Sequence, residues 1–231
     1  MKSFFIFFFL SLNLSSLEKT FATPDKSNQG AWSGYFQSQK NAQPHDLVTK
    51  AFKLIEKKKN VIVIDLGTGN GKDISDILKA GAIVYAYDAD PGSTEIIHKR
   101  FKSYVKNKKL LTHQILFEEI TSLPKADMII FVNSLPFMKK EKLLGFWKII
   151  QDALNPNGIF IGTFFGEKHY AKRDPSRPEI FRVSREEVFN LFTNFQILNF
   201  YEEIEYDEDS SKSWKTDQFH HVYKVIARKK P

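Results

Sequence analysis

The sequence predicts an α/β fold, a mostly parallel sheet with helices on both faces that ends in an antiparallel hairpin. From residue 44 onward, short apolar runs alternate with segments whose apolar residues recur at helical spacing. Near the C-terminus two long strand patterns are separated only by the polar segment 207–217, so they should pair antiparallel. With 231 residues, 42% hydrophobic and 26% charged, the chain has an ordinary globular composition, and one domain accommodates these elements.

The sequence of the first half of the chain predicts three strands that alternate with helices. Residues 47–55 have helical spacing, and the unbroken β-branched run 61–64 predicts a strand buried on both faces. A short helix then ends at Gly81, which tolerates positive φ. The remaining elements are a strand over 83–87, a helix opened by Pro91 that carries Ile96, Ile97, Phe101 and Tyr104, and a strand over 111–117.

The second half completes the sheet. Strands are expected over 128–132 and 159–164, with a helix that carries Leu143 through Leu154 between them. Ser184 and Glu187 have the spacing of a capping box and open a further helix. The final hairpin is expected over 195–206 and 219–228.

The N-terminus has the pattern of a secretory signal. A short basic start precedes an apolar run over 4–12, and small residues end the segment at Ala22. The run is short for a spanning helix, which needs about 20 apolar residues. We therefore expect a signal peptide or membrane anchor over 1–22, an N-terminal extension over 23–43 and the folded domain over 44–231.

A glycine-rich loop, Asp65-Leu66-Gly67-Thr68-Gly69-Asn70-Gly71, carries most of the functional information. It lies between a buried strand and a helix, where a ligand at the carboxyl end of a parallel sheet meets backbone rather than side chains. The dinucleotide pattern G-x-G-x-x-G would need a glycine at the position of Lys72. A second acid, Asp88, ends the next strand, where its carboxylate could accept hydrogen bonds from a ribose diol.

These motifs resemble those of class I S-adenosylmethionine-dependent methyltransferases, over about residue 32 to the C-terminus. The resemblance includes the loop, Asp88 and the turn Leu154-Asn155-Pro156-Asn157-Gly158, and it implies a Rossmann-like sheet of seven strands. The segments 133–137, 164–167 and 225–229 are similar to a bacterial subgroup near the tellurite-resistance type. That subgroup commonly has Cys at the position of Thr68, and few of its members carry an export signal.

The resemblance implies S-adenosyl-L-methionine as the cofactor and assigns residues to it. Asp65 and the backbone of the loop would hold the methionine portion, Asp88 the ribose, and Glu119 the adenine amino group, with Glu118 as the alternative. Asn133, after the fourth strand, would lie where methyl transfer occurs. The implied cofactor residues are Asp65, Gly67, Thr68, Gly69, Gly71, Asp88, Glu119 and Asn133.

Methyl transfer needs chiefly alignment of the acceptor, so a dedicated base is optional. The catalytic candidates are Asn133, where methyl transfer would occur, and Tyr35, His169 and Tyr170, which could form the acceptor wall. His220 and His221 could titrate near neutral pH. The segment 166–183 also concentrates basic residues, which is consistent with an anionic small-molecule acceptor: Lys168, Lys172, Arg173, Arg177 and Arg182.

The composition of the chain excludes several other kinds of site and partner. The chain has no cysteine, which excludes disulfides, thiolate metal sites and a cysteine nucleophile, and we identify no metal site. The net charge of +7 is spread along the chain, so we expect no nucleic-acid partner, and membrane contact only through the N-terminal segment. That segment predicts export or inner-membrane anchoring, in conflict with the cytosolic supply of the cofactor. A nicotinamide-binding Rossmann protein and a non-catalytic nucleotide-binding module are the alternative functions.

Overall fold

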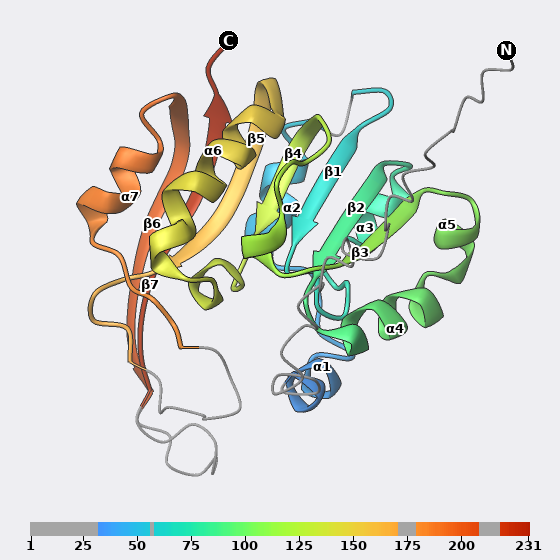
Figure 1. The fold of residues 1–231 in the computed structure, drawn as a ribbon, viewed down its shortest axis with the longest axis horizontal. Helices are drawn as coiled ribbons and strands as arrows, with labels where there is room; N and C mark the ends of the chain where they lie inside the picture. Colours follow the sequence, from blue (N-terminus) through green and yellow to red (C-terminus); the bar gives the residue numbers. More distant parts are fainter. Residues whose placement is uncertain (1–31, 56–57, 171–178, 208–217) are drawn as a thin grey trace, which may run out of the picture.

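The computed structural model describes residues 32–55, 58–170, 179–207 and 218–231. It contains one seven-stranded sheet in the order β3-β2-β1-β4-β5-β7-β6. The first five strands are parallel to one another, and β7 pairs antiparallel with both β5 and β6. The predicted Rossmann-like architecture is therefore confirmed, including the C-terminal antiparallel hairpin (Figure 1).

The elements follow the predicted alternation. The strands are β1 (Ile62–Leu66), β2 (Ile83–Asp88), β3 (Leu110–Gln114), β4 (Ala126–Phe131), β5 (Leu154–Phe165), β6 (Phe195–Asp207) and β7 (Gln218–Lys229). The α-helices are α1 (Ser33–Ser38), α2 (Asp46–Phe52), α3 (Ser75–Lys79), α4 (Pro91–Arg100), α5 (Lys102–Lys106), α6 (Leu143–Ala153) and α7 (Arg185–Leu191).

Local sequence signals set several of the element ends. Gly81 follows α3 with φ +90°, and Pro91 is the first residue of α4. At α7, Ser184 Oγ accepts a hydrogen bond from Glu187 N, and the Glu187 carboxylate accepts one from Ser184 N. The capping box read from the sequence is thus present.

Three predicted boundaries differ from the structure. The single helix expected after Pro91 is broken at Phe101, whose φ of −118° and ψ of 32° separate α4 from α5. The strand expected over 111–117 ends at Gln114, because β2 ends at Asp88, whose carbonyl accepts the last bond from Ile115 N. A 3₁₀ turn, Phe117–Glu119, takes up the rest of that segment. The Asn-Pro-Asn-Gly turn lies inside the bounds of β5, with Asn157 at φ +63°.

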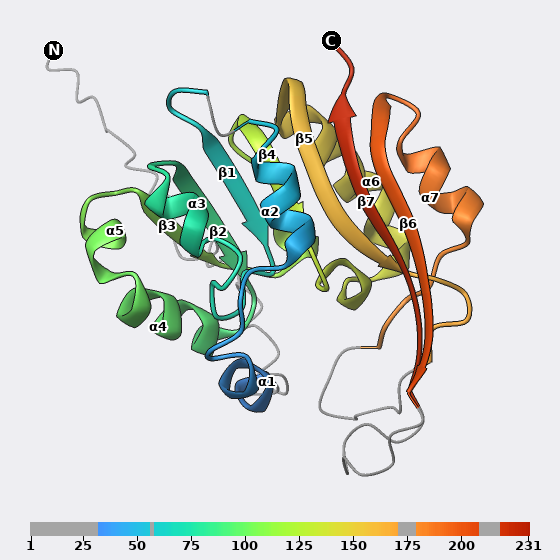
Figure 2. The same ribbon diagram turned by 180° about the vertical axis from the view of Figure 1, so that it is seen from behind.

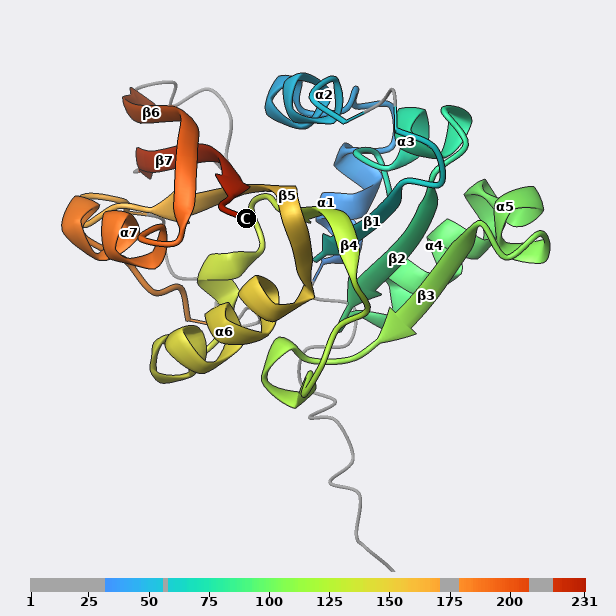
Figure 3. The ribbon, with the colours of Figure 1, turned by 90° about the horizontal axis from the view of Figure 1, so that it is seen from above.

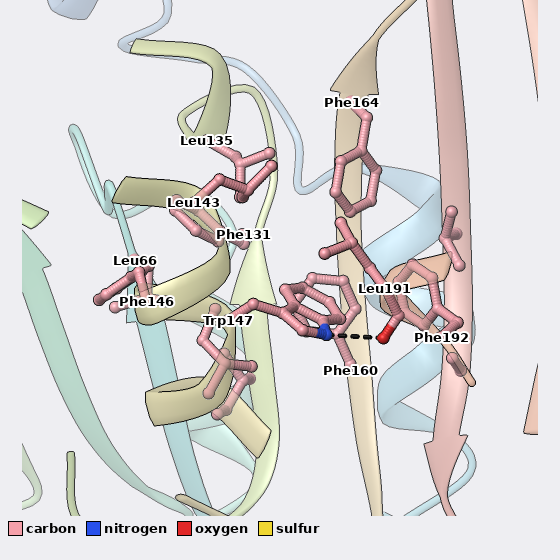
Figure 4. Packing of buried hydrophobic residues seen from close by; sticks show 14 of the residues in the cluster. Leu66, Phe131, Leu135, Leu143, Phe146, Trp147, Phe160, Phe164, Leu191 and Phe192 are labelled. Atoms are coloured by element: carbon pink, nitrogen blue, oxygen red, sulfur yellow. Dashed lines mark hydrogen bonds between the residues drawn. The ribbon is translucent and has the colours of Figure 1, made fainter. Parts of the chain in front are cut away.

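Helices cover both faces of the sheet (Figures 2 and 3). On one face, α2, α3, α4 and α5 pack on side chains such as Val63, Val84 and Ile130. On the other face, α6 and α7 pack on a cluster rich in phenylalanine, with Trp147 among Phe160, Phe164 and Phe192 (Figure 4). Every β4 side chain is buried, as a central strand covered on both faces requires.

The segment 1–22 lies outside the described residues, and so do 23–31 and the basic residues Lys172, Arg173 and Arg177. In the part of the chain that the structure describes, no helix has the length and apolarity needed to cross a bilayer.

Candidate functional site

The glycine loop follows the carboxyl end of β1 and is fixed to the end of β2. The amides of Gly67 and Thr68 both donate to the Tyr87 carbonyl, at 2.8 and 3.1 Å. The loop turns sharply because Gly67, Gly69 and Gly71 have φ values of +78°, +53° and +72°. Its backbone consequently lies at the edge of the sheet where parallel strands leave a crevice.

The three glycines serve different purposes. A Cβ on Gly67 would collide with Ser134, whose hydroxyl donates to the Leu66 carbonyl at 2.6 Å, and one on Gly71 would lie 2.7 Å from the Phe101 ring. A Cβ on Gly69 would point to Phe36 of α1, at 3.3 Å. Gly67 and Gly69 line a cavity, whereas Gly71 is required by packing against Phe101 and is not among the lining residues.

Asp88 fixes the loop from the end of β2. Its Oδ2 accepts a hydrogen bond from Gly69 N at 2.8 Å, and its Oδ1 accepts one from Asp90 N at 2.9 Å. Burial raises the pKa of this carboxyl above its ordinary value, although the two amides oppose the shift. Each oxygen keeps a further acceptor site, so the carboxylate can still accept hydroxyl donors from a ligand.

Asp90, which the sequence analysis did not assign to the site, lies beside Asp88. It caps α4 through Oδ1, which accepts a hydrogen bond from Gly92 N at 2.8 Å. Its Oδ2 is buried and has no hydrogen-bond partner among the described residues. A buried carboxylate oxygen of this kind calls for a donor, which a ligand in the adjoining cavity can supply.

A cavity of about 150 Å³ lies between the loop, the end of β2 and α1. Of the residues predicted to hold a cofactor, Gly67, Thr68, Gly69, Asp88 and Asn133 line it. Tyr35 was predicted, but the helix that carries it, α1, was not: its Phe36 is buried over Gly69, and the carbonyl of the following residue Gln39 accepts a hydrogen bond from the Asn70 side chain. The other lining residues are Trp32, Tyr35, His45, Lys72, Asp73, Ala89, Asp90, Leu116, Phe117, Glu118, Val132, Ser134 and Phe137.

The structure places Glu119 away from this cavity and Glu118 at it. Glu119 turns back to accept a hydrogen bond from Leu116 N at 3.2 Å and so closes its own 3₁₀ turn. Glu118 lines the cavity and accepts a hydrogen bond from Lys139 N at 2.8 Å. Glu118, the alternative to Glu119 in the sequence analysis, is therefore the glutamate that a ligand in this cavity would contact.

Asp65 is buried under the loop instead of lining the cavity. Its side chain is only 3% exposed, and burial, together with the charges of Asp73 and Asp88, raises its pKa to about 8. The raised pKa favours the protonated form of this carboxyl in the folded protein at neutral pH.

We expect Asp65 to make the folded state less stable as pH rises from about 4 to 8. In this range the unfolded carboxyl, with a pKa near 3.8, has lost its proton while the folded one keeps it. The folded state therefore binds more protons, and the free energy of unfolding falls with pH by about a few kcal/mol in total. Asp65→Asn should remove most of this decline, as measured by urea unfolding at pH 5 to 9. Asp76→Asn, at an exposed carboxylate, should leave it intact; equal pH profiles for Asp65→Asn and wild type would contradict the assignment.

A second cavity, of about 990 Å³, adjoins the first. It is lined from α1, α2, the ends of β4, β5, β6 and β7, and residues 179–182. All four predicted catalytic candidates, Asn133, Tyr35, His169 and Tyr170, line it. His220 lines it as well, whereas His221 is buried behind it, with its Nε2 2.9 Å from Glu202. The two cavities share the residues Trp32, Tyr35, His45, Val132, Asn133 and Phe137.

Asn133 lies where the two cavities meet. It has φ +55° directly after β4, and its amide donates to Thr163 Oγ1 at 2.8 Å. The Thr163 hydroxyl in turn donates to Asn133 Oδ1 at 3.1 Å. Because Thr163 is on β5, two neighbouring strands fix the side chain at the junction.

His169 is a buried, neutral imidazole in the wall of the larger cavity. Its ring stacks on Phe165 with centroids 3.8 Å apart, and Arg182 Nε donates to its carbonyl. Burial, with contributions from His220 and Arg182, lowers its pKa to about 4. The described wall carries three basic side chains, Lys50, Arg182 and Lys224, and three acidic ones, Asp46, Glu179 and Glu203. The described wall therefore has no net positive charge from these six side chains that would favour an anionic acceptor.

Residues 63–158 match the family model of the methyltransferase domain. TehB from Haemophilus influenzae has a similar structure, with a TM-score of 0.69 at 16% identity over 88% of this chain and 67% of that one. The 1,6-didemethyltoxoflavin-N1-methyltransferase of Burkholderia thailandensis, solved with its substrate and S-adenosylhomocysteine, gives 0.60 at 15% identity over 87% of each chain.

Magnesium protoporphyrin IX methyltransferase from Synechocystis PCC 6803, solved with S-adenosylhomocysteine, gives a TM-score of 0.63 at 11% identity over 89% of this chain and 97% of that one. No curated protein matches the chain in sequence. The similarity to TehB agrees with the resemblance to the tellurite-resistance type. Residues 63–158 thus match the model of a methyltransferase domain, and the chain has the fold of the S-adenosylmethionine-dependent methyltransferases.

Proposed function

We propose that the chain is an S-adenosyl-L-methionine-dependent methyltransferase that acts on a small-molecule acceptor. The observation that carries this proposal is the pair of adjoining cavities, one lined by the glycine loop and Asp88 and the other by aromatic and polar side chains, with Asn133 between them. A methyl donor and an acceptor bound in the two cavities would meet at that residue. The Burkholderia thailandensis methyltransferase, solved with both S-adenosylhomocysteine and a small-molecule substrate, supports this arrangement.

The residues present fit the cofactor. Asp88 offers a buried carboxylate for a ribose diol, the orphan Oδ2 of Asp90 needs a donor, and glycine leaves the loop backbone open. Leu116, Phe117 and Glu118 supply apolar surface and a carboxylate suited to an adenine ring. When bound, the cofactor supplies an electrophilic methyl group on a positively charged sulfur.

The size of the loop-side cavity has a consequence for binding. Pockets for ligands of this size usually measure roughly 300–1,000 Å³, and this one measures about 150 Å³. The cofactor therefore needs part of the adjoining larger cavity or a movement of α1, whose Phe36 covers Gly69. The short helix α1 would then act as a cover that excludes water from the reacting atoms.

The protein's contribution to the reaction is alignment. Asn133, held by Thr163, and the aromatic side chains of Trp32, Tyr35 and Phe137 form the shared wall of both cavities. A small acceptor confined there would be held close to the methyl group, and such positioning accounts for much of the acceleration of a bimolecular displacement.

The test is calorimetric titration with S-adenosylhomocysteine and, separately, NADH. We expect binding of S-adenosylhomocysteine and no binding of NADH. Binding of NADH in its place would favour the nicotinamide alternative, and binding of neither ligand would favour the non-catalytic module.

Asp88→Ala is expected to weaken S-adenosylhomocysteine binding at least tenfold. Hydrogen bonds to a charged acceptor contribute about 1.5–3 kcal/mol each, and every 1.4 kcal/mol is about a factor of ten in affinity. The change also removes the acceptor of Gly69 N, so the loop loses its anchor to β2. Asp76→Ala, at an exposed carboxylate paired with Lys79, is the matched control and should bind as wild type. A loss below twofold in Asp88→Ala would exclude Asp88 as the ribose acceptor.

A further inference from the structure

His45 is a histidine at the wall shared by both cavities, and it was not among the residues predicted from the sequence. It lies directly before α2, and residues 32–45 bring it past the carboxyl ends of β1 and β4 (Figure 2). Its side chain is 30% exposed, in contact with the cavities on one side and with the loop after β1 on the other.

Asp73 fixes the orientation of this imidazole. Its Oδ1 accepts a hydrogen bond from His45 N at 2.7 Å, and its Oδ2 lies 2.9 Å from His45 Nδ1. The Asp73 side chain is 13% exposed. A carboxylate without its proton only accepts hydrogen bonds, so Nδ1 carries the hydrogen of the neutral ring. Nε2 is then the nitrogen with the free electron pair.

Nε2 points toward the junction of the cavities. Its neighbour there is Asn133 Nδ2, at 3.4 Å, whose N–H can donate to that electron pair. This long hydrogen bond is weak and can be exchanged for one from an acceptor molecule. The arrangement has the order carboxylate, imidazole, then an electron pair that faces the reacting centre, which is the arrangement of a general base oriented by an acid.

The shared wall also indicates the chemical class of the acceptor. Trp32, Tyr35 and Phe137 line both cavities, and Phe165 and Tyr170 continue the aromatic surface into the larger one. Trp32 and Phe137 pack edge to face with centroids 4.7 Å apart. Several aromatic side chains around one cavity favour an aromatic ligand, because aromatic rings pack well edge to face or offset-stacked. A general base beside these aromatic side chains assists methyl transfer only if the acceptor atom that attacks the methyl group carries a proton.

We propose that His45, oriented by Asp73, is the general base that removes the proton from an aromatic hydroxyl acceptor. This inference rests on the proposed methyl transfer. The hydroxyl O–H bond breaks and its proton moves to His45 Nε2, while an oxygen electron pair forms the bond to the methyl carbon. The carbon–sulfur bond breaks, and its electron pair stays on sulfur, which becomes neutral.

The first test requires no acceptor. Long-range ¹H–¹⁵N spectra of protein labelled at histidine, saturated with S-adenosylhomocysteine at pH 8, report which ring nitrogen carries hydrogen. His45, assigned by its loss in His45→Gln, should have hydrogen on Nδ1 and none on Nε2. In Asp73→Asn the amide N–H₂ can donate to Nδ1, so the tautomer should switch. A wild-type ring with its hydrogen on Nε2 would overturn the inference.

The second test compares phenol, which is neutral at pH 8, with 4-nitrophenol, which is largely ionised and needs no base. His45→Gln is expected to slow methylation of phenol about 100-fold or more, in the range of general-base effects, and methylation of 4-nitrophenol less than tenfold. His98→Gln, at an exposed histidine bonded to Thr112, is the matched control and should leave both rates unchanged. Equal slowing of the two phenols would assign His45 a purely structural role, and methylation of neither by the wild-type protein would exclude the aromatic hydroxyl class.

Binding separates this inference from the function on which it rests. Suppose that wild type, His45→Gln and Asp73→Asn all bind S-adenosylhomocysteine, but the tautomer or the methylation rates differ from those expected. The assignment of His45 as the base is then wrong, and the proposed methyltransferase function stands. If the wild-type protein does not bind S-adenosylhomocysteine, the proposed function itself fails.

Discussion

Gly69→Val is expected to lower the affinity for S-adenosylhomocysteine by at least 100-fold, about 2.8 kcal/mol of binding free energy. Gly69 has φ +53°, a region that a β-branched residue avoids, and its Cβ would lie 3.3 Å from the Phe36 ring. The amide of Gly69 also donates to Asp88 at 2.8 Å. The valine therefore displaces α1, occupies the ligand's space and disturbs the carboxylate that is proposed to bind ribose. Calorimetric titration measures the loss.

Two further variants separate the effect of backbone strain at positive φ from the effect of a side chain that fills the ligand's space. Gly81→Val places the same side chain at φ +90°, with no atom within 4 Å of its Cβ and away from both cavities, so it should lose stability but keep its affinity. Asparagine tolerates positive φ, so Gly69→Asn relieves the backbone strain. Its side chain still occupies the ligand's space, so its affinity for S-adenosylhomocysteine should remain low. An affinity in Gly69→Val equal to that of Gly81→Val would remove the loop from the binding site.

The elements and the loop were predictable because their signals are local. An unbroken β-branched run before a glycine loop, and an acid at the end of the next strand, placed Gly67, Gly69 and Asp88 at one edge of the sheet, and the structure brings them together at one cavity. Parallel strands align their carboxyl ends whatever the connecting helices contain. The capping box at Ser184 was equally local and is present.

The parts that were missed depend on contacts between distant segments. His45 and Asp73 are 28 residues apart, and neither has a distinguishing local pattern. The six residues of α1 are too few to show helical periodicity, although their burial of Phe36 over the loop closes the cavity. The choice between Glu118 and Glu119 depended on the 3₁₀ turn Phe117–Glu119, in which the Glu119 carboxylate bonds back to Leu116 N while Glu118 lines the cavity.

Trp147→Ala is expected to lower the free energy of unfolding by about 3–5 kcal/mol, the usual cost of removing a buried aromatic side chain. Trp147 is 3% exposed, and its ring lies within 4.8–6.3 Å, between centroids, of the rings of four phenylalanines from β5, the end of α7 and the start of β6 (Figure 4). Its Nε1 donates to the Leu191 carbonyl at 2.7 Å, so the alanine also leaves that buried acceptor unpaired. The indole thus links α6 to the end of α7.

Urea unfolding followed by circular dichroism measures this cost, with two variants on the same helix for comparison. Trp147→Phe keeps most of the ring contacts and loses the hydrogen bond, so it should cost less than Trp147→Ala. Leu144→Ala removes a side chain that is 75% exposed and should change stability by no more than about 0.5 kcal/mol. Because Trp147 lines neither cavity, folded Trp147→Phe should bind S-adenosylhomocysteine as wild type. A cost for Trp147→Ala as small as that of Leu144→Ala would show that α6 does not depend on this contact.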